Sequence, residues 1–199
     1  MRRLIAFVSR LPGRLLKQSA LVTALGFCML CGVLADDIAV SEQTFSCILD
    51  WAKIRGTYIK NVDPEKLKEA MRIFRDNGSD TEYPVGTILQ LIPNEAMVKH
   101  PRGTFAKTND WEFFALDVSA AGTKITDRGE NVLEVFDMDA SAAGTKMSDH
   151  PRGVTCLSCQ QGGAKHDLVC EKGHESPPIP LNDQQIAKIQ AGDPRCANK

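Results

Sequence analysis

The sequence has few aromatic residues and few histidines. Aromatic side chains make up 6% of the 199 residues, and there are four histidines. The chain also lacks three familiar catalytic motifs: the Gly-rich phosphate loop, the His-Glu-x-x-His zinc pair and the Gly-x-Ser-x-Gly turn. These absences exclude a P-loop nucleotide hydrolase, a zincin protease and an α/β-hydrolase.

Acidic residues are missing from the first 35 positions, which hold five basic residues and then an apolar run from 19 to 35. This layout is typical of a secretory signal. The run is shorter than the roughly 20 apolar residues of a membrane-spanning helix. We expect cleavage after Ala35 and export to the periplasm. A lipoprotein signal is disfavoured by the bulky residues before Cys28 and Cys31, and an uncleaved anchor is the remaining alternative.

Basic residues are in deficit once this segment is removed. The five basic residues of the signal leave 19 of the 24, against 25 acidic ones, so the formal charge of the mature chain is near −6. That balance argues against a nucleic-acid partner. Residues 36–199 are long enough to bury a core and fit a single domain.

Two helices and then a series of strands are expected in this domain. Apolar spacing predicts helices over 41–54 and, from the Asp63-Pro64 start, over 63–76. Strands are predicted at 87–92, 111–117 and 132–136, and a short helix capped at Asn182 or Asp183 ends at Gly192. Helices followed by strands indicate an α+β fold, an antiparallel sheet with flanking helices.

A repeat and two turn-like histidines lie in the strand region. The segment from Phe114 to Asp127 recurs 22 positions later, and each copy ends a strand in Ser-Ala-Ala-Gly-Thr-Lys, which predicts a duplicated hairpin. His100 and His150 each precede Pro-Arg-Gly, where an exposed imidazole is expected. Aspartates near these turns lack the spacing of a calcium loop and are expected to be solvated, so no metal is assigned to them.

The residues best suited to chemistry are concentrated between Cys156 and His174. The mature chain has five cysteines: Cys47, Cys156, Cys159, Cys170 and Cys196. In one interpretation, Cys156 and Cys159 attach haem c, although the next position is Gln160 and not the usual histidine. In a second, zinc binds Cys156, Cys159, Cys170 and either His166 or His174. In a third, disulfides staple the C-terminal segment to the sheet.

Several motifs in this order resemble the cytochrome P-460 family and its cytochrome c′-beta relatives. They are Tyr83-Pro-Val-Gly-Thr87, Asp110-Trp-Glu-Phe-Phe114, Cys156-x-x-Cys159, Asp167-Leu-Val-Cys-Glu171 and Asp193-Pro-Arg-Cys196. The resemblance covers roughly residues 45 to 196. It implies a periplasmic c-type haem protein, frequently a homodimer, that binds or oxidises hydroxylamine or nitric oxide. An enzyme of this kind is an oxidoreductase that needs an electron-transfer partner.

Carried onto this chain, the resemblance makes Cys156 and Cys159 the haem-attaching thiols and shows two departures. The proximal histidine is replaced by Gln160, for which His166 is the substitute axial-ligand candidate. Ser176 stands near where relatives place a cysteine, which implies that Cys170 pairs with Cys196 or Cys47. The rival hypothesis is a haem-free, disulfide-stapled binding or structural module of the same descent. Some relatives also carry a haem-linked lysine, and Lys99 and Lys107 lie in the corresponding region.

Overall fold

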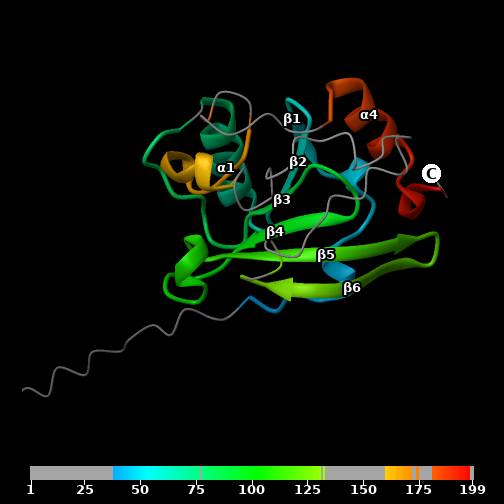
Figure 1. The fold of residues 1–199 in the computed structure, drawn as a ribbon, viewed down its shortest axis with the longest axis horizontal. Helices are drawn as coiled ribbons and strands as arrows, with labels where there is room; N and C mark the ends of the chain where they lie inside the picture. The colour runs from blue at the N-terminus through cyan, green and yellow to red at the C-terminus, as the bar shows by residue number, and fades with distance from the viewer. Residues whose placement is uncertain are drawn as a thin grey trace, which may run out of the picture. The chain divides into compact units, whose positions relative to one another are not determined.

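The computed structural model describes residues 38–76, 78–130, 132, 160–171, 174 and 181–197. Its centre is a six-stranded sheet in which each strand pairs antiparallel with the next along the chain (Figure 1). The strands are β1 (Ala52–Ile54), β2 (Thr57–Lys60), β3 (Ile88–Gln90), β4 (Glu95–Lys99), β5 (Trp111–Ser119) and β6 (Gly122–Gly129). The expected α+β class with an antiparallel sheet is confirmed.

The register of the strands gives the sheet two apolar faces. Met97 pairs with Phe113, and these side chains join Ile59 and Leu89 in one buried cluster. Neighbouring positions point the other way, because side chains alternate along a strand. The residues of that second face are Tyr58, Ile88, Ala96, Val98, Phe114 and Leu116, with Phe45, Ile48 and Trp51 packed on them.

Helix α1 (Pro64–Asp76) packs on the first face, and its sequence explains both ends. The Asp63 carboxylate accepts hydrogen bonds from the backbone amides of Glu65 and Lys66, as an N-cap should. Proline is tolerated at the first helical position because that amide has no partner within the helix. The predicted stripe is confirmed: Ala70 and Phe74 are buried, and Leu67 and Met71 pack against the cluster.

The helix predicted over 41–54 is wrong. The segment forms two short 3-10 helices, η1 (Glu42–Thr44) and η2 (Ile48–Asp50), and then strand β1. Ser41 does begin η1, through a capping box with Thr44. Phe45 and Ile48 are buried as the pattern required, but against a sheet face, where tertiary packing overrides a weak helical preference.

The hairpin of β5 and β6 matches the first copy of the repeat. The predicted strand at 111–117 extends to Ser119, and β6 begins at Gly122 after a tight turn. The second copy lies outside the described residues, as does the predicted strand at 132–136 apart from Val132. Strands β1, β2 and β4 were not predicted, since they are short or carry mixed polar residues, and β6 was expected only as the second arm of the hairpin, without bounds of its own.

The C-terminal helix was predicted correctly. Helix α4 (Asp183–Ala191) starts at Asn182, whose side chain accepts a hydrogen bond from the amide of Gln185, and ends at Gly192. Ile186 and Ile189 form a small cluster with Ile92 and Leu181. Within the described ranges, no helix combines the length and apolar character needed to cross a membrane.

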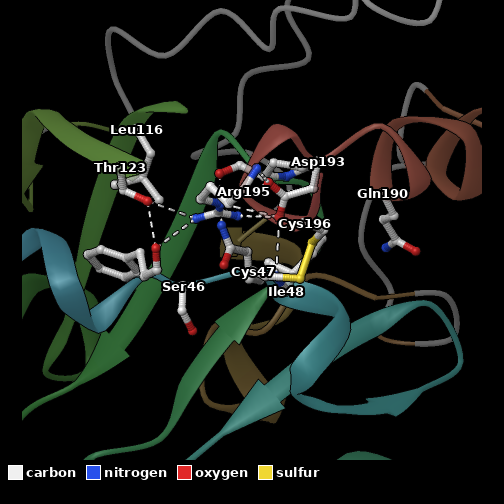
Figure 2. A network of polar contacts seen from close by, with 12 residues as sticks. Ser46, Cys47, Ile48, Leu116, Thr123, Gln190, Asp193, Arg195 and Cys196 are labelled. Carbon is white, nitrogen blue, oxygen red and sulfur yellow. Dashed lines mark hydrogen bonds and ion pairs between the residues drawn. A yellow bond between two sulfur atoms is a disulfide. The ribbon is translucent and has the colours of Figure 1, made fainter. Parts of the chain in front are cut away.

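A disulfide ties the two ends of the described chain together. Cys47, just before η2, bonds to Cys196 in the terminal 3-10 helix η7 (Pro194–Cys196), across 149 positions of sequence (Figure 2). A bridge that closes so long a loop restricts the unfolded chain strongly. The bond fixes the segment around Cys47 beside η7.

Arg195 reinforces the same junction by hydrogen bonds (Figure 2). Its guanidinium donates to both carboxylate oxygens of Asp193 and to the carbonyl of Phe45 and the hydroxyl of Thr123. The Asp193 carboxylate also accepts from the amide of Ile48 at 3.1 Å. The Arg195 and Asp193 side chains are 3% and 0% exposed, so this ion pair is buried and fully hydrogen-bonded.

We predict that the double variant Cys47→Ala, Cys196→Ala loses roughly 3 kcal/mol of unfolding free energy, since the long-range crosslink disappears from the unfolded state. Urea unfolding measures the loss. The matched control is Ser46→Ala, a neighbouring change that keeps the disulfide. Equal midpoints for the double variant and the unchanged chain would show that the bridge contributes nothing.

Candidate functional site

Only some of the residues predicted for chemistry belong to the part of the chain that the structure describes. Cys156 and Cys159, the predicted haem-attaching thiols, lie outside the described residues. Gln160, His166 and Cys170 are described and belong to one short segment, residues 160–171, which contains the 3-10 helix η6 (Ala164–His166). This segment is therefore the described part of the predicted site.

Segment 160–171 folds back on itself tightly. Gly163 lies so close to Val169 that an added Cβ atom would meet the Val169 carbonyl oxygen at 2.5 Å, so only glycine fits. The Gln160 side-chain carbonyl accepts a hydrogen bond from the amide of Cys170 at 3.1 Å. Gln160, which occupies the position of the usual haem histidine, thus closes this loop.

Cys170 is disulfide-bonded. Because Cys47 and Cys196 bond to each other, the pairing of Cys170 with either of them is wrong. A cysteine in a disulfide is not a thiolate, so Cys170 in this state is not a zinc ligand.

His166 and His174 stack on each other. Their ring centroids are 3.8 Å apart and the planes differ by 6°. His174 donates from Nδ1 to the Val169 carbonyl at 2.7 Å, and burial lowers its pKa. A metal ion binds in the plane of an imidazole, so two parallel stacked rings do not converge on one ion. The residues that the structure describes contain no metal-binding group of three or more such side chains.

Beside this segment lies a deeply buried ion pair. The Lys99 ammonium group lies 2.7 Å from both carboxylate oxygens of Asp167, and the two side chains are 4% and 1% exposed. Lys99 also donates to the carbonyl of Asn109 at 2.5 Å and lies over the Trp111 ring. A charge pair this deep is stable only when its other hydrogen-bonding capacity is satisfied.

Neighbouring residues supply the further hydrogen bonds that Asp167 needs. Asp167 accepts a hydrogen bond from the amide of Tyr83 at 2.8 Å, and its carbonyl accepts from the Trp111 indole at 2.7 Å. Burial raises the pKa of Asp167, and the hydrogen bonds from Lys99 and Tyr83 oppose that shift. Burial also raises the pKa of the Tyr83 phenol, with the charges of Glu171 and Asp167 adding to it.

Arg55 clamps the other end of the segment. It occupies the turn between β1 and β2 with a left-handed φ of 53°, and its guanidinium binds both carboxylate oxygens of Glu171 at 2.9 and 3.0 Å. The same group donates to the carbonyls of Phe74 and Arg75, at the end of α1. Lys99 and Arg55 together hold residues 167 and 171 against the sheet and α1.

His100 is buried, although an exposed imidazole was predicted at this position. It is 3% exposed, and its Nε2 lies 2.9 Å from the Glu112 carboxylate, which also binds Arg128. Burial alone would raise the pKa of Glu112, but the hydrogen bonds from His100 and Arg128 hold it below its ordinary value. The Pro-Arg-Gly that follows does form a loop, but the loop begins after His100, whose imidazole lies on the second face of the sheet.

Glu95 is the exception among the buried carboxyl groups. Its Oε1 is buried and has no hydrogen-bond partner within the described residues, and burial raises the pKa of the carboxyl to about 7. Glu95 pairs with Ala115, so its side chain is on the face that carries Met97 and Phe113. Buried unpaired acids of this kind are concentrated at functional sites.

The local sequence does not indicate the roles of Lys99 and Glu95. Lys99, which lies in the region expected for a haem-linked lysine, is paired with Asp167, whereas Lys107 is exposed. Glu95 was not singled out, because β4 itself was not predicted. The apolar run from Ala96 to Val98, between Glu95 and Lys99, was the available signal for a strand.

The residue after Cys159 differs from that of the usual c-type haem motif. That attachment needs an imidazole directly after the second cysteine. Gln160 stands there, and its amide is used in the Cys170 hydrogen bond. His166, the substitute candidate, has a buried Nδ1 with no hydrogen-bond partner in the described segments, but one face of its ring is covered by His174.

Comparisons with known protein families, with curated proteins and with solved structures find no match to this chain.

We predict that Lys99→Met destabilises the protein by about 3–5 kcal/mol, because the Asp167 carboxylate is left buried without its cation. Adding Asp167→Asn should recover part of the loss, since the buried charge is then removed. Thermal or urea unfolding of both variants tests this. The control is Arg72→Met, which breaks an exposed pair with Glu69 and should cost at most about 1 kcal/mol. A double variant less stable than Lys99→Met alone would contradict the account.

We predict that Glu95 makes the folded protein less stable as the pH rises. The pKa of the Glu95 carboxyl is about 7 in the folded protein, against an ordinary 4.5. The neutral carboxyl therefore stabilises the fold below pH 4.5, and this stabilisation is lost as the pH rises through about 7. The loss between about pH 5 and pH 8 should be roughly 2 kcal/mol. Glu95→Gln should remove that part of the slope of stability against pH, whereas Glu65→Gln, an exposed control, should not.

Proposed function

We propose that this chain is an exported, haem-free, disulfide-stapled binding module of cytochrome P-460-like descent. The observation that carries the proposal is the state of Cys170. It is disulfide-bonded, and its amide is held by the side chain of Gln160. Gln160, which stands in place of the haem histidine, therefore stabilises the loop that contains the disulfide-bonded Cys170.

The two departures from the family pattern fit each other under this proposal. Relatives carry a histidine at the position of Gln160 and a cysteine near Ser176. A chain that lost both would keep a Cys170 without its usual partner, beside a cysteine pair without its haem ligand. We propose that Cys156 or Cys159 is now the partner of Cys170. A thiol used in that bond is not available for a thioether to haem.

The negative formal charge and the predicted signal segment support the cellular setting. An oxidising envelope favours a domain whose cysteines are bridged, and the Cys47–Cys196 bond agrees with that environment. Periplasmic localisation and removal of residues 1–35 are part of the proposal. A domain of this kind would recognise a small molecule or a protein surface without transferring electrons.

One observation favours the alternative, a haem c protein that binds or oxidises small nitrogen compounds and passes electrons to a periplasmic partner. The buried Nδ1 of His166 has no hydrogen-bond partner in the part of the chain described. An imidazole in that state is available to a ligand. In this alternative Cys156 and Cys159 would hold the haem, His166 would be its axial ligand, and the group would supply redox chemistry.

The test is the intact mass and visible spectrum of the mature chain, produced with its signal in a host that has haem-attachment machinery. We predict a colourless protein, cleaved after Ala35, with no porphyrin mass, and a peptide containing Cys170 linked to one containing Cys156 or Cys159. A covalently attached porphyrin would overturn the proposal. His166→Ala then separates the alternatives: a changed spectrum would identify His166 as the axial ligand.

The control variant is Gln160→His, which restores the attachment motif. If the disulfide of Cys170 uses one of the two thiols, this variant should still emerge without haem under the same conditions. Adding Cys170→Ala to it should then permit attachment. Haem on Gln160→His alone would show that the disulfide does not block the site.

A further inference from the structure

The amine of Lys99 and the carboxyl group of Asp167 are placed so that they could react with each other. Lys99 Nζ lies 2.7 Å from Oδ1 and 2.7 Å from Oδ2 of Asp167. A nitrogen at equal distance from both oxygens is also close to the carbon between them, at roughly the 3 Å separation of a near-attack arrangement. Asp193, by contrast, binds Arg195, whose guanidinium stays charged and is a poor nucleophile. A lysine amine becomes a nucleophile once it loses a proton.

The surroundings of the Lys99–Asp167 pair favour the uncharged forms of both groups. The two side chains are 4% and 1% exposed. The buried ring of Trp111 lies beside them, with its centroid 5.3 Å from Lys99 Nζ. Because charges are penalised where water is excluded, a neutral amine and a neutral acid lie closer in free energy to the ion pair here than they do in water. The same exclusion of water opposes hydrolysis of a bond formed between the two groups.

Two backbone groups hold the reacting atoms in place. The Asn109 carbonyl accepts a hydrogen bond from Lys99 Nζ at 2.5 Å, which orients the amine. The Tyr83 amide donates to Oδ2 of Asp167 at 2.8 Å. When a nitrogen adds to a carboxyl carbon, negative charge develops on an oxygen, and a backbone N–H that points at this oxygen stabilises it. Oδ2 is therefore the oxygen that stays, and Oδ1 is the oxygen that leaves.

We infer that Lys99 and Asp167 are the site of an intramolecular isopeptide bond. One proton passes from Lys99 Nζ to Oδ1 of Asp167, which leaves a neutral amine and a neutral acid. The Nζ lone pair then forms a bond to Cγ, and the electron pair of the carbonyl moves to Oδ2, beside the Tyr83 amide. A second proton passes from Nζ to Oδ1, the double bond to Oδ2 forms again, and Oδ1 departs as water. The ion pair thus becomes one amide and one water molecule, with no oxidant, reductant or co-reactant.

This bond adds a second covalent link to the fold. It joins β4 to segment 160–171 across 68 positions of sequence, and reducing agents do not open it. A crosslink over so long a loop restricts the unfolded chain, as the Cys47–Cys196 disulfide does. The reaction uses neither the other cysteines nor haem, so its test does not depend on the function proposed above.

The experiment is the mass of the mature chain after reduction and alkylation of its cysteines, followed by a tryptic digest. We predict a mass lower than that of the sequence by one water molecule, and a branched peptide in which 166–172 is joined to 76–102. The longer arm runs past Lys99 because trypsin does not cleave after an acylated lysine. Lys107, an exposed lysine whose Nζ lies 4.0 Å from Glu130, is the control within the same digest and should be unlinked. The full sequence mass, with cleavage after Lys99, would overturn the inference.

Two variants separate the nucleophile from the charge. Lys99→Arg keeps a cation opposite Asp167 but has no amine that can attack, so we predict complete loss of the branched peptide and the full sequence mass. Lys107→Arg, the matched exposed change, should retain the same yield of the branched peptide as the unchanged chain. A chain with Lys99→Arg that is still lighter by one water and still branched at 166–172 would show that another lysine supplies the amine, and would overturn the assignment.

Discussion

The buried pairing of Lys99 with Asp167 is the interaction on which the arrangement of the predicted site depends. It joins a central strand of the sheet to a segment 68 positions later, in surroundings where neither charge is exposed. Coulombic attraction is strong there, but so is the cost of removing two charges from water. The pair is tolerated because the Asn109 carbonyl accepts from Lys99 and the Tyr83 amide donates to the Asp167 carboxylate, while the Trp111 indole satisfies the backbone carbonyl of Asp167. Removal of any one of these groups would leave a buried polar atom unmatched.

The same principle governs the rest of the interior. Arg195 with Asp193 holds the chain end, Arg128 with Glu112 closes the second face, and each pair is completed by backbone carbonyls or a neighbouring side chain. Against that background, the buried Oε1 atoms of Glu95 and Gln90 and the Nδ1 of His166 stand out, since the described residues give them no hydrogen-bond partner. The Glu95 and His166 groups can ionise, whereas the Gln90 amide cannot. They differ in chemistry, since one carboxyl favours a cation and one imidazole nitrogen suits a metal or a hydrogen-bond donor.

Local patterns predicted the helices with clear ends. Asp63-Pro64 and Asn182 begin α1 and α4 because a short polar side chain can hydrogen-bond the first amides of a helix, whatever lies elsewhere in the chain. The segment over 41–54 carried an equally plausible apolar spacing and was misassigned. There the burial of Phe45 and Ile48 against the sheet and the bond of Cys47 to Cys196 decide the backbone, and neither is a local property.

The sequence by itself determined the α+β class, the two capped helices and the first hairpin of the repeat. Each of these follows from spacing or composition within a few residues. The tertiary structure alone decided that Lys99 faces Asp167, that His100 is buried against Glu112 and that Cys47 joins Cys196. It also decided that the buried Oε1 of Glu95 has no hydrogen-bond partner among the described residues. The physical reason is that pairing and burial depend on which distant strands and segments come together, and a linear pattern contains no record of those distances.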